Sequence, residues 1–357
     1  MSATSVLVVD DSALMRKLIK RILTDGGGFE VHTARNGLDA LDQLPRVQPD
    51  VVTLDVNMPE MDGLTCLSEI MKRQPRPVVM VSSLTSDGAL VTLEALQLGA
   101  VDFVPKPGGT VSLDLEQVAG QLVAKVEAAA RARVSRAGGL AARLREQRGE
   151  VTQQQRVVRR TGRGATGSAD AVLIGSSTGG PALLAQILSR LPGSLAAPVV
   201  VAQHIPASFT ATLARRLDET CQLRVEEVTR PTPARAGHVY IGRGDADVVL
   251  ARREDGLVVR PVPAGANYRW HPSVDRLVAS ARRVLDPARL VCVQLTGMGD
   301  DGAEEMAAVR AARGRTIAEA EETAVVWGMP GELVRRGGAS CVLPNHLIAD
   351  RIIDWVG

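Results

Sequence analysis

Cysteines, net charge and long apolar runs are all scarce in this sequence. Its 357 residues include only four scattered cysteines, with no C-x-x-C pair and no histidine nearby at a zinc-ligand spacing. This pattern gives no zinc-ligand spacing and favours a reducing compartment without disulfides. The formal net charge of +2 gives no strong reason to expect nucleic acid or an anionic membrane as a partner.

Apolar runs stay well short of the roughly 20 residues that a transmembrane helix needs. The chain also opens without a basic, apolar leader. We therefore expect a cytoplasmic protein with no membrane insertion.

One segment stands out by its composition. Residues 126–168 carry 10 arginines against three glutamates and show almost no aliphatic periodicity after Leu144. Such a segment is typical of a flexible basic linker rather than of a third folded domain. The parts on either side are each long enough to bury a core. We therefore expect two domains, residues 1–125 and 169–357, joined by this linker.

The first domain alternates between short β-branched runs and amphipathic stretches. The runs lie at residues 6–9, 30–34, 51–54, 78–81 and 101–104. Because an amphipathic stretch follows each run, the pattern is a five-fold βα alternation. It predicts a (βα)5, flavodoxin-like fold with a doubly wound parallel sheet.

The second domain restarts the same alternation. Strands are expected at 171–174 and 198–202, with helices at 181–190 and 209–217. Between Val239 and Val262, turn signals separate short apolar runs, which predicts an antiparallel hairpin. We expect a second α/β domain, whose mostly parallel sheet has this hairpin inserted into it or appended to it.

Polar residues lie at the ends of successive strands in the first domain. They are Asp10, Asp11, Asp55, Ser82 and Lys106. The carboxyl ends of parallel strands converge on one crevice, where three carboxylates repel one another unless a divalent cation lies between them. Mg²⁺ suits such an all-oxygen site, and Asp55 could then attack a phosphoryl donor. Turn residues after Asp55 allow the backbone carbonyl of Asn57 to face the metal.

The segments DD, D-x-N-M-P-x-M-D-G, MVSS and FVPKP, over residues 4–125, resemble the receiver domains of two-component response regulators. The resemblance implies that Asp55 accepts a phosphoryl group from a histidine kinase. It also implies that Mg²⁺ is held by Asp10, Asp11, Asp55 and the Asn57 carbonyl. Ser82 and Phe103 are the implied switch residues, and Lys106 is the implied contact of the phosphoryl group.

Each of these residues alone has an ordinary explanation as well. Asp10 and Asp11 could cap a helix starting near Ala13, Lys106 could be a solvated charge, and Phe103 could be core. Five polar residues at successive strand ends are harder to explain by packing alone. For Phe103 the two interpretations are about equal, because a lone aromatic near a strand end is often only core.

The second domain contains a serine in a glycine-rich turn. Residues 175–179, Gly-Ser-Ser-Thr-Gly, match G-x-S-x-G centred on Ser177 and lie between an expected strand and helix. Small residues permit a sharp turn that exposes the hydroxyl, and the helix start offers N–H groups to an oxyanion. The pattern alone is weak, because such turns can also bind phosphate.

Two further residues follow other expected strands and complete a hydrolase pattern. His204 can accept the serine proton, and Asp301 can orient the imidazole and stabilise its cation. The chain order Ser, His, Asp differs from the Ser, acid, His order of α/β-hydrolases, which argues against an ordinary lipase or esterase. This chemistry needs no metal or organic cofactor.

The segments IGSSTGG, QHIP-x-x-F and LTGMG-x-DGA, over residues 170–356, resemble the CheB family of chemotaxis protein-glutamate methylesterases and glutamine deamidases. The resemblance implies Ser177 as nucleophile, His204 as general base and Asp301 as orienting acid. It also implies an oxyanion hole and substrate cleft from the Met298 amide, Thr178 and residues 270–275. The implied substrates are methyl-accepting chemoreceptors, and the implied role is adaptation. The unphosphorylated receiver would block the substrate cleft, and its phosphorylation would open the cleft.

Several alternatives stay open at this point. Asp300 could replace Asp301, and Ser176 could replace Ser177, although the glycine spacing favours Ser177. His271 is a weaker candidate base for which a cleft-lining or capping role is favoured. The same chemistry could serve a non-motility pathway. A response regulator whose output domain binds DNA or a protein would leave the serine, histidine and aspartate pattern unexplained.

Overall fold

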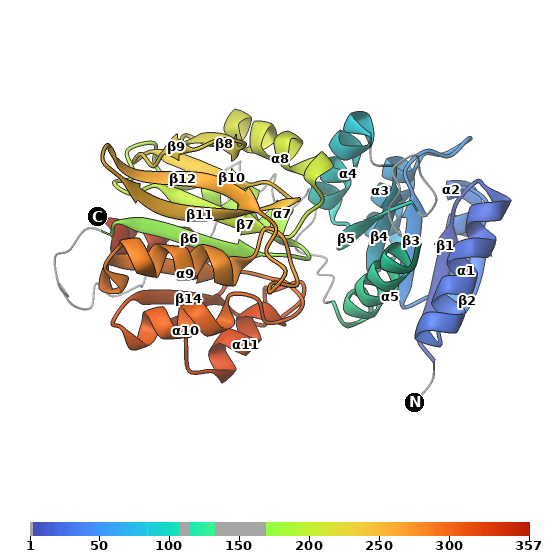
Figure 1. Cartoon of the computed structure of the whole chain (residues 1–357). Helices are drawn as coiled ribbons and strands as arrows, with labels where there is room; N and C mark the ends of the chain where they lie inside the picture. The colour runs from blue at the N-terminus through green and yellow to red at the C-terminus, as the bar shows by residue number, and fades with distance from the viewer. Residues whose placement is uncertain (1–2, 84, 107–114, 133–168) are drawn as a thin grey trace, which may run out of the picture. The chain divides into compact units, whose positions relative to one another are not determined.

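The computed structural model describes residues 3–83, 85–106, 115–132 and 169–357, which form two compact units (Figure 1). Most of the expected linker, residues 133–168, lies outside the described residues. The boundaries at residues 125 and 169 therefore stay a prediction. Among the described residues, no helix combines the length and apolar character that crossing a membrane requires.

The first unit contains a five-stranded parallel sheet with the order β2-β1-β3-β4-β5. Its strands are β1 (Ser5–Val9), β2 (Glu30–Ala34), β3 (Val51–Asp55), β4 (Val78–Ser82) and β5 (Asp102–Pro105). This is the doubly wound order of flavodoxin-like folds, so the predicted fold is confirmed.

Helices connect these strands. They are α1 (Ala13–Gly27), α2 (Gly37–Val47), α3 (Gly63–Arg73), α4 (Ser86–Leu98) and α5 (Leu115–Arg131). At the start of α1 the side chain of Ser12 accepts a hydrogen bond from the Met15 amide, and this is an N-cap. The capping role that Asp10 and Asp11 could have had therefore belongs to Ser12.

The second unit is built on a seven-stranded parallel sheet with the order β15-β14-β13-β6-β7-β10-β8. Its strands are β6 (Ala171–Ser176), β7 (Val199–Gln203), β8 (Arg224–Val228), β10 (His238–Gly242), β13 (Leu290–Gln294), β14 (Arg315–Glu319) and β15 (Cys341–Leu343). Strands β6, β7 and β13 are buried along their whole length, as expected for parallel strands covered on both faces.

The expected antiparallel hairpin is present, as β11 (Ala246–Arg253) and β12 (Gly256–Pro263). With β9 (Thr232–Pro233) it forms a separate three-stranded sheet. It is therefore neither inserted into the parallel sheet nor appended to it. The first part of the predicted hairpin region, β10, is instead a parallel strand between β7 and β8.

The helices of this unit are α7 (Gly180–Leu188), α8 (Ala207–Thr220), α9 (Val274–Val284), α10 (Ala303–Ala311), α11 (Met329–Arg335) and α12 (Asn345–Val356), with the 3-10 helix η3 (Pro287–Arg289). Figure 1 shows α9 in orange lying alongside α10, and α9 also contacts the hairpin strand β11.

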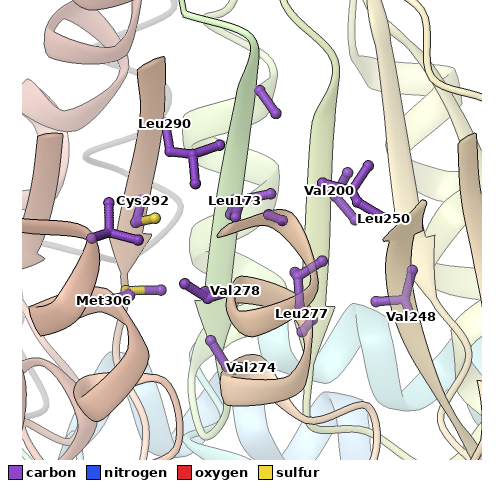
Figure 2. Packing of buried hydrophobic residues seen from close by; sticks show 14 of the residues in the cluster. Leu173, Val200, Val248, Leu250, Val274, Leu277, Val278, Leu290, Cys292 and Met306 are labelled. Carbon is purple, nitrogen blue, oxygen red and sulfur yellow. The ribbon is translucent and has the colours of Figure 1, made fainter. Parts of the chain in front are cut away.

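A continuous hydrophobic core holds α9 against the sheet (Figure 2). Val274, Leu277 and Val278 of α9 are fully buried, and they belong to the same cluster as Leu173 of β6 and Met306 of α10. Burying side chains of this size stabilises a fold by about 1.5–3 kcal/mol each. This packing fixes the start of α9 next to the end of β6, because a Cβ on Gly175 would lie only 2.5 Å from Val274 Cγ1.

Candidate functional site

The serine turn follows directly on strand β6. Gly179 has a φ of 78°, a left-handed conformation that favours glycine, and a Cβ there would lie 2.7 Å from Val325 Cγ2. The Ser177 amide donates to the Thr296 carbonyl at 3.0 Å, and the Ser177 carbonyl accepts from the Gly180 amide at 2.8 Å. The glycine and these backbone bonds fix the shape of the turn.

A buried glutamine holds the same turn from the side of β7. Gln203 accepts a hydrogen bond from Ser176 Oγ at 2.6 Å and donates from Nε2 to the carbonyl oxygens of Ser177, at 2.9 Å, and His204, at 3.1 Å. Ser176 is fully buried, whereas Ser177 is partly exposed. This difference favours Ser177 over Ser176 as the reactive serine. Sequence reasoning missed Gln203, although it ends a buried strand.

His204 and Asp301 lie together although 97 residues separate them along the chain. His204 Nε2 is 2.8 Å from Asp301 Oδ2, and both side chains are buried. The second ring nitrogen, Nδ1, is buried and has no hydrogen-bond partner in the part of the chain that the structure describes. Trp270 stacks on the imidazole with ring centroids 5.2 Å apart. The bond at Nε2 therefore orients the ring, and Nδ1 remains available for another partner.

Asp301 binds the first turn of α9. Its carboxylate accepts the backbone amides of Val274, at 2.7 Å, and Asp275, at 3.0 Å, and also the Ser273 hydroxyl at 3.0 Å. A negative charge is stabilised at a helix N-terminus. Burial raises the pKa of Asp301, but the His204 bond and these amides together hold it below the usual value. Asp301 is thus kept ionised beside the imidazole.

The neighbouring Asp300 has different surroundings. It is exposed, and its Oδ2 lies 3.8 Å from an Arg336 nitrogen. Its side chain therefore faces a surface arginine, whereas Asp301 contacts His204. This geometry favours Asp301 as the orienting acid.

The loop after β13 reaches the serine. A Cβ on Gly297 would lie 2.7 Å from Ser177 Cβ, so only glycine fits between these backbones. Thr296 Oγ1 donates to the Thr178 carbonyl at 2.9 Å, which ties this loop to the serine turn. Met298 follows Gly297 directly, and its expected contribution to an oxyanion hole stays a prediction.

Glu319, at the end of β14, holds this loop in place. Its Oε2 accepts the Thr296 amide at 2.8 Å, and its Oε1 accepts the Thr323 hydroxyl at 3.0 Å. Burial raises the pKa of Glu319 to about 7, against the lowering effect of these two hydrogen bonds. Sequence reasoning missed this acid, which the rule of polar residues at strand ends could have found.

His271 belongs to a separate buried cluster around Asp247. His271 Nδ1 lies 2.9 Å from Asp247 Oδ1, and the same carboxylate accepts the Ser273 amide at 2.7 Å and Arg276 Nη1 at 2.5 Å. Asp247 is 1% exposed. This cluster fixes the segment before α9, which favours a structural role for His271 over a role as competing base.

The expected acidic site of the first unit is assembled. Carboxylate oxygens of Asp10, Asp11 and Asp55 all lie within 4.8 Å of one another. Lys106 Nζ lies 2.7 Å from Asp55 Oδ2 and 3.2 Å from Asp10 Oδ2. Asp10 Oδ2 is buried and accepts no hydrogen bond among the described residues, so its only close partner there is the lysine charge. This donor set fits an oxygen-liganded divalent cation.

Charge coupling is strong in this cluster. Burial raises the pKa of Asp55, with a smaller raising effect from Asp10, against the lowering effect of Lys106. Burial alone lowers the pKa of Lys106, but Asp55 and Asp10 together raise it above its usual value. The lysine is therefore a partly buried cation paired with two acids, not a solvated charge.

The two expected switch residues lie on β4 and β5. Ser82 is buried, and its carbonyl accepts the Lys106 amide at 2.8 Å. Phe103 is also buried, with Lys125 Nζ 5.0 Å from its ring centroid. Their roles in switching, and the Asn57 carbonyl as a metal ligand, stay predictions.

Two family models match this chain. Residues 172–352 match the CheB methylesterase model, and residues 6–115 match the response regulator receiver domain. The first match covers the Ser177, His204 and Asp301 positions, and the second covers the acidic cluster.

Similar proteins cover the chain from end to end. Protein-glutamate methylesterase/protein-glutamine glutaminase 3 of Rhodospirillum rubrum is 54% identical over 99% of this chain and 96% of its own length. A protein of the same description, numbered 2, from Carboxydothermus hydrogenoformans is 47% identical over all of both chains. The crystal structure of the Thermotoga maritima CheB methylesterase catalytic domain is 37% identical, with a TM-score of 0.50. It covers 53% of this chain and 99% of that one.

Proposed function

The chain belongs to the CheB methylesterase family, and we propose that it is a phosphorylation-activated serine hydrolase of chemoreceptors. Its reaction is hydrolysis of glutamate methyl esters, together with deamidation of glutamines, on receptor helices. The observation that supports this best is the buried His204–Asp301 pair, which leaves one imidazole nitrogen available beside the serine turn.

In the proposed reaction Ser177 attacks the γ-carbonyl of the esterified glutamate. His204 accepts the hydroxyl proton, and because Nε2 is bound to Asp301 the accepting nitrogen is Nδ1. This exchanges the two ring nitrogens relative to the serine-protease template, in which the acid binds Nδ1. The ionised Asp301 stabilises the imidazolium, and the Met298 amide donates to the developing oxyanion.

The remaining steps release first methanol and then the serine. His204 gives its proton to the leaving methoxide, and methanol departs. His204 then takes a proton from a water molecule that attacks the acyl-enzyme, and it returns this proton to Ser177 Oγ as the acyl bond breaks. Glutamine follows the same steps with ammonia as the leaving group. Thr178 and the segment 270–275 line the substrate cleft in this proposal, with Trp270 covering one face of the imidazole and the Asp275 carboxylate bound to α10.

The receiver domain controls this activity in our proposal. Asp55 accepts a phosphoryl group from a chemotaxis histidine kinase, and Lys106 and Ser82 then contact that group. Asp10, Asp11, Asp55 and the Asn57 carbonyl would hold Mg²⁺. When bound, Mg²⁺ supplies positive charge that offsets the crowded carboxylates and the transferring oxygens.

Methanol release from methylated receptor fragments tests the catalytic assignment. We expect release by the wild type and none by Ser177→Ala. The matched control is Ser176→Ala, because Ser176 is the adjacent serine but its hydroxyl is bound to Gln203. Release by Ser177→Ala, or its loss only in Ser176→Ala, would contradict the assignment.

The same assay tests the regulatory assignment. Acetyl phosphate with Mg²⁺ should raise methanol release by the wild type and should have no effect on Asp55→Asn. Asp25→Asn is the control, since Asp25 is an exposed aspartate near the end of α1. Equal stimulation of the wild type and Asp55→Asn would rule out Asp55 as the phospho-acceptor.

A further inference from the structure

Helices α9 and α10 lie side by side (Figure 1). An acid at the start of each helix accepts backbone amides of the other. Asp301, in the segment before α10, accepts the Val274 and Asp275 amides of α9. In return, Asp275, in the first turn of α9, accepts the Glu305 amide of α10 at 3.2 Å. The N-cap position of α10 is Gly302, which offers no capping side chain. Asp275 therefore performs for α10 the task that an N-cap side chain normally performs.

This exchange keeps two carboxylates close together, and one of them, Asp301, is bound to the imidazole. Burial raises the pKa of Asp275 to about 6, and the charge of Asp301 adds to this effect. Asp301 has its pKa lowered instead, so it is the acid that stays ionised as pH falls. Above about pH 6 both acids are charged, and His204 is bound directly to Asp301.

Other charges around Asp275 are mostly paired. Glu305 of α10 repels it but forms an ion pair with Arg282 of α9. Arg276, the next residue of α9, is bound to Asp247 on β11. These pairings leave the charge of Asp275 acting mainly on Asp301 and, through it, on His204.

We propose that Asp275 is a positioning residue of the proposed hydrolase. Asp275 holds Asp301 against His204, and its carboxylate adds a second negative charge to the electrostatic field at the imidazole. This inference rests on the proposed function, since it assigns a role within the same reaction. The charge of Asp275 stabilises the imidazolium through space, because opposite charges favour the protonated form.

The decisive variant is Asp275→Asn, which keeps an oxygen to accept the Glu305 amide but removes the charge. With one negative charge fewer, the imidazole keeps its proton less readily, so the acidic limb of the activity profile moves to lower pH. We expect a shift on the order of half a pH unit, with the plateau rate within about threefold of wild type. Asp275→Ala also loses the cap, and its plateau should fall about tenfold.

Two measurements give the profile: methanol release, and labelling of Ser177 by a fluorophosphonate probe, which needs no receptor substrate. Asp286→Asn is the control, because Asp286 is an exposed aspartate that caps η3 at the opposite end of β13. Its profile should match that of the wild type.

The inference is overturned if the acidic limb of the Asp275→Asn profile does not move. It is also overturned if Asp275→Asn loses the same fraction of activity at every pH, because a purely structural role predicts that result. Failure of the proposed function has a different signature. In that case the wild type releases no methanol, while probe labelling still reports whether the limb moves in Asp275→Asn.

Discussion

Replacing Glu319 by glutamine should change the pH dependence of stability in a predictable way. The carboxyl is fully buried and accepts one hydrogen bond at each oxygen, from Thr296 and Thr323. Glutamine has nearly the same shape, keeps one acceptor oxygen for the Thr296 amide and can donate to the Thr323 hydroxyl. The variant therefore removes the ionisable group and little else.

The sign follows from the direction of the pKa change. The pKa of Glu319 is raised from 4.5 to about 7, so between these values the folded protein keeps a proton that the unfolded chain has lost. Stability from this group is complete below the unfolded pKa and is lost as pH rises through the folded one. At 1.4 kcal/mol per pKa unit, the loss between pH 5 and pH 8 is about 2.5 kcal/mol.

Tryptophan fluorescence during urea unfolding measures this effect in the intact chain. All three tryptophans, Trp270, Trp327 and Trp355, lie in the second unit, so the signal reports the unfolding of that unit alone. The free energy of unfolding of Glu319→Gln, relative to wild type, should rise by about 2.5 kcal/mol from pH 5 to pH 8.

A control variant separates this effect from general acid and base behaviour. Glu254 is an exposed glutamate in the turn between β11 and β12, and Glu254→Gln should follow the wild type at every pH. A difference between Glu319→Gln and wild type that stays constant across the range would refute the raised pKa, because Glu319 would then be ionised to the same extent in the folded and unfolded states.

Two further variants test the supports of each site. Gln203→Leu removes the side-chain hydrogen bonds to the serine turn, so kcat for methanol release should fall by about tenfold or more with little change in KM. Gln186, an exposed residue of α7, gives the control: an equal fall of kcat in Gln186→Leu would contradict this prediction. Lys106→Met leaves Asp10 and Asp55 buried without their cation and should destabilise the first unit by about 3 kcal/mol in the absence of Mg²⁺. Hydrogen exchange of the β3 amides measures that loss, and Mg²⁺ should reduce it; unchanged exchange would argue against the ion pair.

Much of both sites could be predicted from one rule about parallel sheets. Residues that follow the parallel strands of one sheet all lie at its carboxyl edge, so Asp10, Asp55 and Lys106 could be grouped from sequence. The same rule brings His204 to Asp301. It works because alternating β-branched and amphipathic runs define the strand ends to within a residue or two, whatever the loop lengths between them.

Local patterns were less informative about how sheets and helices are combined. The turn signals after Val239 predicted an antiparallel hairpin, but they could not decide that β11 and β12 form their own sheet while β10 joins the parallel one. A turn fixes the pairing of its two flanking strands, whereas membership of a sheet depends on contacts with distant strands. For the same reason Asp247 could not be recognised, since its partners lie 18 to 29 residues further along the chain.

The arrangement of acids around α9 explains why side-chain patterns alone were insufficient. Asp247 holds the Ser273 amide, Asp301 holds the next two amides, and Asp275 holds an amide of α10. Most of these donors are backbone N–H groups, which every residue except proline supplies, so no distinctive residue type marks them in the sequence. They also keep their protons at any ordinary pH. The orientation of the proposed catalytic acid is therefore carried mainly by the packing of two helix starts.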